Sequence, residues 1–122
     1  MTAPARSTPG SHVARSTIED ALEGMRRDFC AGLDARICRI ESARLDVASD
    51  TRAALESLKF EAHRICGVAG SLGLNAVSAQ ARALEEHVGR IEGRPLSPDE
   101  QKELNRRVED FLDLLEDHLT DD

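Results

Sequence analysis

The sequence predicts an all-α protein, an antiparallel up-down four-helix bundle with a flexible N-terminal tail. Its 122 residues are 40 % hydrophobic but only 2 % aromatic, without Trp or Tyr. The core must therefore consist of Leu, Ile, Val and Ala, which suits packed helices better than a sheet. Apolar residues recur at steps of three and four, as in amphipathic helices. Short loops separate these stretches, and short loops favour antiparallel neighbours.

The first fifteen residues, MTAPARSTPGSHVAR, mix Pro, Ser, Thr, Gly and Arg without periodicity. This composition predicts a flexible tail over residues 1–15, which includes His12, and leaves residues 16–122 for one bundle domain. The tail has no apolar stretch of the kind that a secretory signal requires.

The first helix is expected to begin at Ser16, which forms an S-x-x-E capping box with Glu19, and to run to about residue 45. Gly24 or Gly32 could bend or divide this helix, since Gly weakens a helix interior by about 1 kcal/mol relative to Ala. One apolar stripe follows it through Ile18, Leu22, Met25, Phe29, Leu33, Ile37 and Ile40.

The remaining helices follow from their start signals. Residues 46–50 form a connection in which Ser49 or Asp50 caps a helix over residues 51–71. Asn75 is the expected cap of a third pattern, which carries Leu74, Val77, Ala81, Leu84, Val88 and Ile91. After a loop at residues 92–96, Ser97 and Glu100 form a second capping box around Pro98. The last helix carries Leu104, Val108, Phe111, Leu112, Leu115 and Leu119.

Charge and composition exclude several function classes. The net charge is −7, with 23 acidic and 16 basic residues, which opposes binding to nucleic acid. No apolar run approaches the roughly 20 residues that cross a membrane. Cys30, Cys38 and Cys66 are odd in number and lie in predicted helices, so we expect packing thiols, no disulfide framework and a cytoplasmic location. No zinc-binding motif or phosphate-cradling Gly-rich loop occurs, so no metal, cofactor or kinase ATP site is expected.

His63 is the residue with the strongest chemical potential. At about 100° per residue, the apolar positions of its helix lie roughly 80° to 180° away from it, so its side chain should face solvent. These apolar positions are Leu55, Leu58, Ala62, Ile65, Ala69 and Leu72. A solvent-facing imidazole is largely neutral near physiological pH and can form a covalent intermediate through a ring nitrogen. His87 and His118 are expected at the surface without a function.

Two glycines, Gly67 and Gly70, lie close to the His63 direction, together with Glu56 and Lys59. In a helix interior they cost about 2 kcal/mol against alanine. Either they let another surface approach the imidazole, or they allow close helix packing or mark a fraying end. Periodicity does not decide between these interpretations.

The run AHRICGVAGSLGL, residues 62–74, resembles the active-site signature of histidine-containing phosphotransfer (HPt) domains. In that family, Gly residues follow the phosphorylated His by four and ten positions, as Gly67 and Gly73 do here. Leu84-Glu85 resembles the Leu-Glu or Leu-Gln pair of the family's next helix, and the resemblance covers about residues 17–120. The sequence departs from the family at Cys66, where a Lys near the phosphoryl group is usual. Lys59 and Arg64 are nearby cations that could substitute.

The resemblance implies a phosphocarrier rather than a self-sufficient enzyme. His63 would take a phosphoryl group on a ring nitrogen, Nε2 being expected, from a receiver-domain aspartate and pass it to another receiver. Response-regulator receiver domains and a hybrid histidine kinase would be the partners, with Mg²⁺ on the receiver. Gly67, Gly70 and Ser71 would form the docking face of a monomer, and Glu85 would hydrogen-bond near His63.

Two alternatives stay open. The first is the dimerisation and phosphoacceptor element of a histidine kinase, which usually carries an acidic residue directly after the His, where Arg64 stands here. The second is a non-catalytic helical adaptor that binds receivers without accepting a phosphoryl group. The first alternative requires a dimer, and the second predicts that no label exchanges with a receiver.

Overall fold

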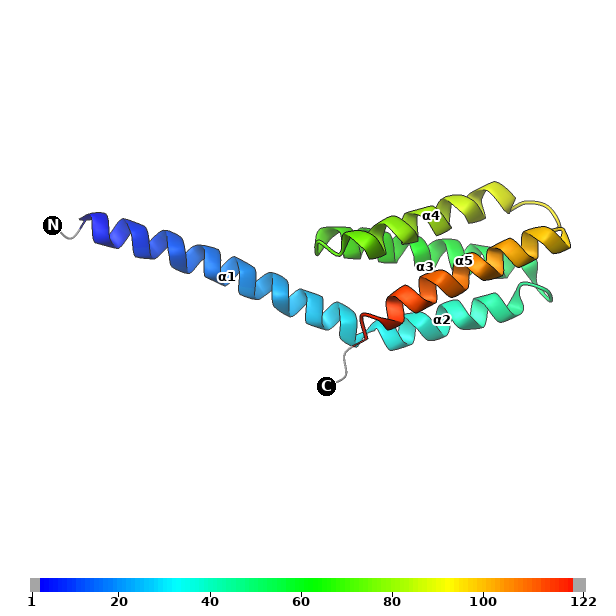
Figure 1. Cartoon of the computed structure of the whole chain (residues 1–122), viewed down its shortest axis with the longest axis horizontal. Helices are drawn as coiled ribbons and strands as arrows, with labels where there is room; N and C mark the ends of the chain where they lie inside the picture. The colour runs from blue at the N-terminus through cyan, green and yellow to red at the C-terminus, as the bar shows by residue number, and fades with distance from the viewer. Residues whose placement is uncertain (1–2, 120–122) are drawn as a thin grey trace.

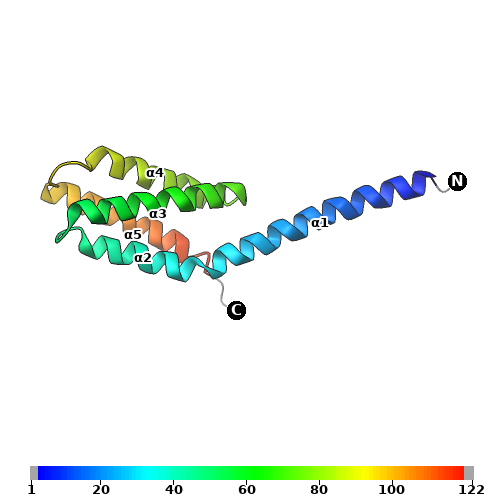
Figure 2. The ribbon, with the colours of Figure 1, turned by 180° about the vertical axis from the view of Figure 1, so that it is seen from behind.

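The computed structural model describes the backbone of residues 3–119 and the side chains of residues 17–119. The helices of this part are α1 (Ala3–Ala31), α2 (Leu33–Asp46), α3 (Thr51–Ser71), α4 (Asn75–Ile91) and α5 (Pro98–Glu116). Helices α2 to α5 form the bundle, and α1 extends away from it, as the two opposite views show (Figures 1 and 2). The predicted all-α class and the four-helix bundle are confirmed.

The chain order of the bundle helices is also their order in space. Helix α3 packs against α2 and α4, and α5 packs against α4 and α2 (Figure 1). The side chains at the centre are almost all aliphatic, and the bulkiest fully buried ones are Phe111, Leu33, Ile40, Leu55, Leu58, Ile65, Leu104 and Leu115. The core therefore has the aliphatic composition that the scarcity of aromatic residues predicts.

The predicted helix start at Ser16 is wrong, because α1 begins at Ala3 and continues through Ser16. The preceding residues Val13, Ala14 and Arg15 include good helix formers, so a local capping box does not force a start there. Residues 3–15, the described part of the predicted tail, are thus the N-terminal part of α1 and lie away from the bundle in both views (Figures 1 and 2). Residues 1–2 lie outside the described residues.

Gly32 divides the predicted first helix into α1 and α2. Its N–H donates to the carbonyl groups of Asp28 at 3.1 Å and Phe29 at 3.2 Å, and α2 begins at the next residue. The apolar stripe is divided as well. Phe29 is buried, whereas Ile18 and Met25 are 61 % and 51 % exposed. The turn at Gly32 thus leaves part of α1 without a covering helix.

The helix caps agree with the sequence at two of the four predicted starts, since Ser16 and Asn75 do not cap a helix. The Asp50 side chain accepts from the Ala53 N–H, and Ser97 forms the expected capping box. Asn75 is not a cap, because α4 begins directly after Leu74 and has no side-chain cap. The reason is the way in which α3 ends: Gly73 has a φ of 77°, and the N–H of Leu74 turns back to the Ala69 carbonyl at 2.9 Å. After this Schellman motif, Gly73 and Leu74 alone connect α3 to α4. Asn75 is therefore already the first residue of α4 and does not cap it.

Two predictions about surface residues need correction. His87 is buried, only 8 % exposed, because α5 covers that side of α4, and its Nε2 has no hydrogen-bond partner among the described residues. His118 is half-buried, with Nδ1 3.1 Å from the Leu114 carbonyl oxygen.

The prediction that the three cysteines pack holds for two of them. Cys38 is exposed and does not pack, whereas Cys30 and Cys66 contact the core. None of the helices in the described part of the chain is long and apolar enough to cross a membrane.

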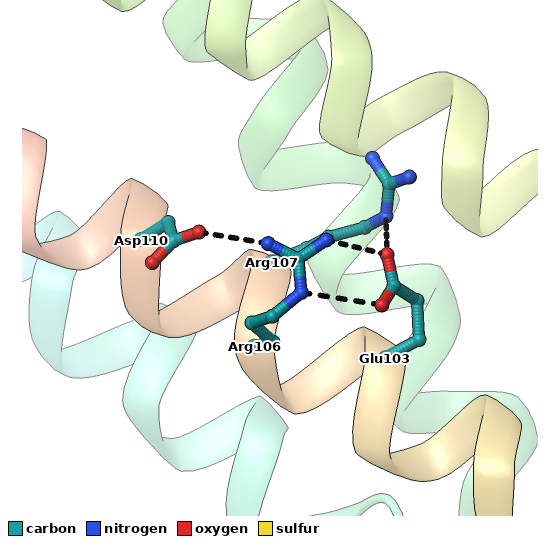
Figure 3. Close-up of polar contacts among 4 residues, drawn as sticks. All are labelled: Glu103, Arg106, Arg107 and Asp110. Carbon is teal, nitrogen blue, oxygen red and sulfur yellow. Dashed lines mark hydrogen bonds and ion pairs between the residues drawn. The ribbon is translucent and has the colours of Figure 1, made fainter.

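Ion pairs follow α5 where it borders α4. Arg106 contacts both Glu103 at 2.7 Å and Asp110 at 3.2 Å, and Arg107 contacts Glu103 at 2.8 Å (Figure 3). Exposed pairs of this kind contribute little to the free energy of folding. Arg107 matters more as a positive charge near the buried His87.

Candidate functional site

His63 projects from the middle of α3 with 75 % of its side chain exposed. Its Nδ1 lies 2.8 Å from Oε2 of Glu85, which comes from α4. A carboxylate only accepts hydrogen bonds, so Nδ1–H donates and the lone pair of the neutral ring stays on Nε2. The pair thus selects the tautomer in which Nε2 is a nucleophile.

A polar hollow of about 590 Å³ opens between α3 and α4 beside the imidazole. We call it the polar hollow, and it is lined by Lys59, His63, Cys66, Gly67, Arg82, Glu85, Glu86 and Gly89. A Cβ atom added at Gly67 or Gly89 would have nothing within 4 Å. The two helices therefore leave open space beside the ring, one glycine on each.

The cations around the polar hollow differ in their partners. Lys59 donates to Oε1 of Glu92 at 2.6 Å, and this hydrogen bond raises the pKa of the Lys59 ammonium. Arg64 stacks over the Phe60 ring at 5.5 Å, within reach of a cation–π interaction. Arg82 is exposed and has no hydrogen bond or ion pair with any residue that the structure describes.

Cys66, at the position of the family's usual lysine, faces α4. Its Sγ lies 3.5 Å from Oγ of Ser78, and that hydroxyl donates to the Cys66 carbonyl at 2.9 Å. A Cβ atom at Gly70 would come within 3.1 Å of the same hydroxyl oxygen. Gly70 thus serves the close approach of α3 and α4, while Gly67 stands beside open space. The packing interpretation therefore fits Gly70, and the docking role of Gly67, Gly70 and Ser71 stays a prediction.

An apolar groove of about 710 Å³ lies on the other side of His63 and is walled by α1, α2 and α3. The apolar groove is lined by Met25, Asp28, Phe29, Arg36, His63, Arg64, Gly67, Val68, Ser71 and Leu72. Met25 and Val68 are 51 % and 37 % exposed, although both are apolar. Apolar side chains gathered beside a reactive group are typical of a protein-docking site.

Three contacts shape this groove. The Nε of Arg26 donates to the Leu72 carbonyl at 2.8 Å, which ties α1 to the end of α3. The Arg36 guanidinium lies 5.7 Å from the centre of the Phe29 ring, and burial together with the nearby Arg64 lowers its pKa. Ser71 donates through Oγ to the Gly67 carbonyl at 3.0 Å. The groove therefore has a basic edge and a fixed wall.

The residues singled out in the sequence thus fall on two sides of one histidine. Lys59, Cys66 and Glu85 line the polar hollow, Arg64 and Ser71 line the apolar groove, and His63 and Gly67 belong to both. Sequence reasoning missed Arg82, although its place three residues before Glu85 puts it on the same face of α4. It also missed the apolar groove, since no pattern within one helix reveals three helices meeting. Among the described residues, no cluster of three His, Cys, Asp or Glu side chains could hold a metal ion.

Comparison with protein families gives a match to the Hpt domain over residues 24–120, which is most of the chain. The chain belongs to the Hpt domain family. Hpt domains perform histidine phosphotransfer in phosphorelays and interact with receiver domains of two-component systems. Neither the comparison with curated proteins nor that with solved structures gave a match. The match confirms the resemblance read from residues 62–74.

Proposed function

We propose that His63 accepts a phosphoryl group on Nε2 from a receiver-domain aspartate and passes it to the aspartate of a second receiver. The observation that carries this proposal is the hydrogen bond between Nδ1 and Glu85 at 2.8 Å, on an otherwise exposed imidazole. It directs the ring's lone pair to the accessible nitrogen. Membership of the Hpt domain family supplies the class of reaction.

The step balances without a cofactor on this chain. The Nε2 lone pair attacks phosphorus, the bond between phosphorus and the aspartyl oxygen breaks, and the receiver's carboxylate leaves. The phosphorylated ring becomes an imidazolium whose Nδ1–H still donates to Glu85, and that carboxylate offsets the new positive charge. The return step is the reverse reaction with another carboxylate.

The partner has to supply what this surface lacks. Acidic residues and Mg²⁺ of a receiver domain would stabilise the transferring phosphoryl group, and this chain would contribute a positioned nucleophile. The apolar groove, with Val68 and Met25 exposed beside His63, suits an apolar element of the receiver. We propose response-regulator receivers and the receiver of a hybrid histidine kinase as the partners.

The fold bears on the two alternatives. A kinase dimerisation element completes its bundle with a second copy, whereas α2 to α5 close a bundle within this single chain. A monomer in size-exclusion chromatography with light scattering would agree with the proposal. The adaptor alternative differs only in chemistry, because an adaptor would bind a receiver without taking label from it.

The decisive experiment incubates the protein with a radiolabelled phosphorylated receiver. We expect a label that is labile in acid and stable in alkali, and we expect none on His63→Ala. His118→Ala is the matched control, since His118 is half-buried and distant in sequence, and it should be labelled like the wild type. Label retained on His63→Ala would contradict the proposal.

A further inference from the structure

Arg82 is the candidate cation for binding an anionic ligand in the polar hollow. Arg82 lies on α4 three residues before Glu85, so the two side chains share a helix face. Its guanidinium is exposed and lines the same hollow as His63, without a hydrogen bond or ion pair to any described residue. A guanidinium presents several donors in a planar fork that matches phosphate oxygens.

The polar hollow would need such a cation once His63 is phosphorylated. A phosphoryl group carries close to two negative charges near neutral pH. The hollow already contains the carboxylates of Glu85 and Glu86. Like charges so close together raise the free energy of the phosphorylated form unless a cation offsets them.

The other candidates near the ring are engaged or neutral. Lys59 is bound to Glu92 at 2.6 Å, and Arg64 stacks over Phe60 and lines the apolar groove instead of the polar hollow. Cys66 carries no positive charge, and its Sγ contacts Ser78. Arg82 is therefore the cation that can turn toward a new anion without breaking a contact within the described residues.

We propose that Arg82 binds the phosphoryl oxygens on Nε2 of His63, from the facing helix, and supplies the charge that Cys66 does not. The inference rests on the proposed function of His63. Arg82 forms and breaks no covalent bond, and its N–H groups donate to the phosphoryl oxygens. Gly67 and Gly89, whose positions border open space, leave room for the group between the two helices.

The test uses Arg82→Gln, which keeps helix propensity and removes the charge. Arg90→Gln is the matched control, since Arg90 is also an exposed arginine of α4 but lies outside the polar hollow. The probe donor is phosphoramidate, whose P–N bond breaks and releases ammonia as the bond from Nε2 to phosphorus forms. This small donor needs no docking surface, so the label on which the phosphoryl pKa is measured does not depend on docking.

Two quantities are measured on the labelled protein. A nearby cation favours the phosphoryl dianion and so lowers its pKa. Because Arg82→Gln removes this cation, we expect the pKa of the phosphoryl group, followed by ³¹P NMR, to rise. We also expect the equilibrium level of phospho-His63 against a receiver to fall about three- to tenfold at low salt. Arg90→Gln should match the wild type in both, and Cys66→Lys added to Arg82→Gln should restore much of the loss.

The outcomes separate the two proposals. Absence of label on the wild type from both phosphoramidate and a receiver would overturn the proposed function itself. Normal labelling of the wild type, with Arg82→Gln equal to Arg90→Gln in phosphoryl pKa and equilibrium level, would overturn the role of Arg82 alone. Circular dichroism of each variant checks that the helices are intact, and Arg82→Lys should recover part of the effect if charge is what matters.

Discussion

The surfaces on the two sides of His63 differ in chemistry, although α3 contributes residues to both. Toward α4 the surface is polar, with Glu85 on the imidazole and with Arg82, which has no ion pair in the described part of the chain. Toward α1 and α2 it is apolar, with Met25, Phe29 and Val68 exposed or lining a groove. The difference indicates a division of work, in which the polar side handles the charge of the phosphoryl group and the apolar side holds the partner.

Only two residues, His63 and Gly67, line both the polar hollow and the apolar groove. Variants that change one side can therefore be compared with variants at Gly67, which change both. If the proposal is right, transfer from a receiver requires both sides, whereas labelling by a small donor requires only the polar side. Measuring both transfer from a receiver and labelling by a small donor therefore tests each side of His63 separately.

Gly67→Gln should have the largest effect. The new side chain stands beside the imidazole and should slow transfer from a receiver by more than about tenfold, because a bulky group at the centre of an interface blocks close approach. The fold should not suffer. Gln adds helix propensity worth up to about 1 kcal/mol, and the position has nothing within 4 Å of its Cβ. Transfer at the wild-type rate in a folded Gly67→Gln protein would contradict the assignment of this face.

Val68→Asp should separate the two sides. The substitution removes apolar contact area and puts a carboxylate that must be desolvated into an apolar interface, so we expect transfer from a receiver to fall about tenfold or more. Val68 lines only the apolar groove, so labelling by phosphoramidate should remain close to the wild-type level. A parallel loss in both assays would show that the two sides do not act separately.

Lys59→Ala should have a smaller effect on the polar side. Its ammonium lies one helical turn before His63 but is engaged with Glu92, and an exposed pair contributes little. We expect a several-fold slower transfer or shorter phosphohistidine lifetime at most, followed by decay of the radiolabel at low salt, where screening is weakest. Cys66→Lys should restore much of the loss. Lys59→Ala should also change less than Arg82→Gln, and the reverse order would assign the phosphoryl group to Lys59.

The smallest effect is expected at His87, on the side of α4 that α5 covers, away from the polar hollow and the apolar groove. Burial and the nearby charges of Arg107 and Arg90 lower the pKa of His87, and Glu103 and Glu100 oppose this in part. Between that lowered pKa and the ordinary value of about 6.5, the unfolded chain binds more protons than the folded one. The free energy of unfolding should therefore fall as the pH drops below about 6.5.

His87→Leu should make this pH dependence shallower, since it removes the buried imidazole, whose Nε2 no described residue hydrogen-bonds. Urea denaturation between pH 7.5 and 5 measures the slope. The range avoids the titration of Glu100, whose pKa the hydrogen bonds of Arg94 and Ser97 lower to about 2. An unchanged slope in His87→Leu would assign the acid sensitivity to other groups. Both sides of His63 should remain intact at neutral pH in this variant.

Much of the fold could be read from local patterns. The spacing of Leu55, Leu58 and Ile65 placed His63 on the outer face of its helix, because a helix repeats every 3.6 residues whatever surrounds it. The capping box at Ser97 is similarly local, since it involves four consecutive residues. The glycine positions after His63, with Leu84-Glu85, were enough to indicate the family that residues 24–120 match.

The sequence by itself thus determined which helices form and which of their faces turn outward, but not which helix covers which face. Only the packing of α5 on α4 buried His87, and only the approach of α4 to α3 gave Gly70 a neighbour at 3.1 Å while leaving Gly67 open. The turn at Gly32 likewise decided that Met25 would wall a groove. Periodicity is a property of one helix, whereas these contacts depend on the positions of two or three helices at once.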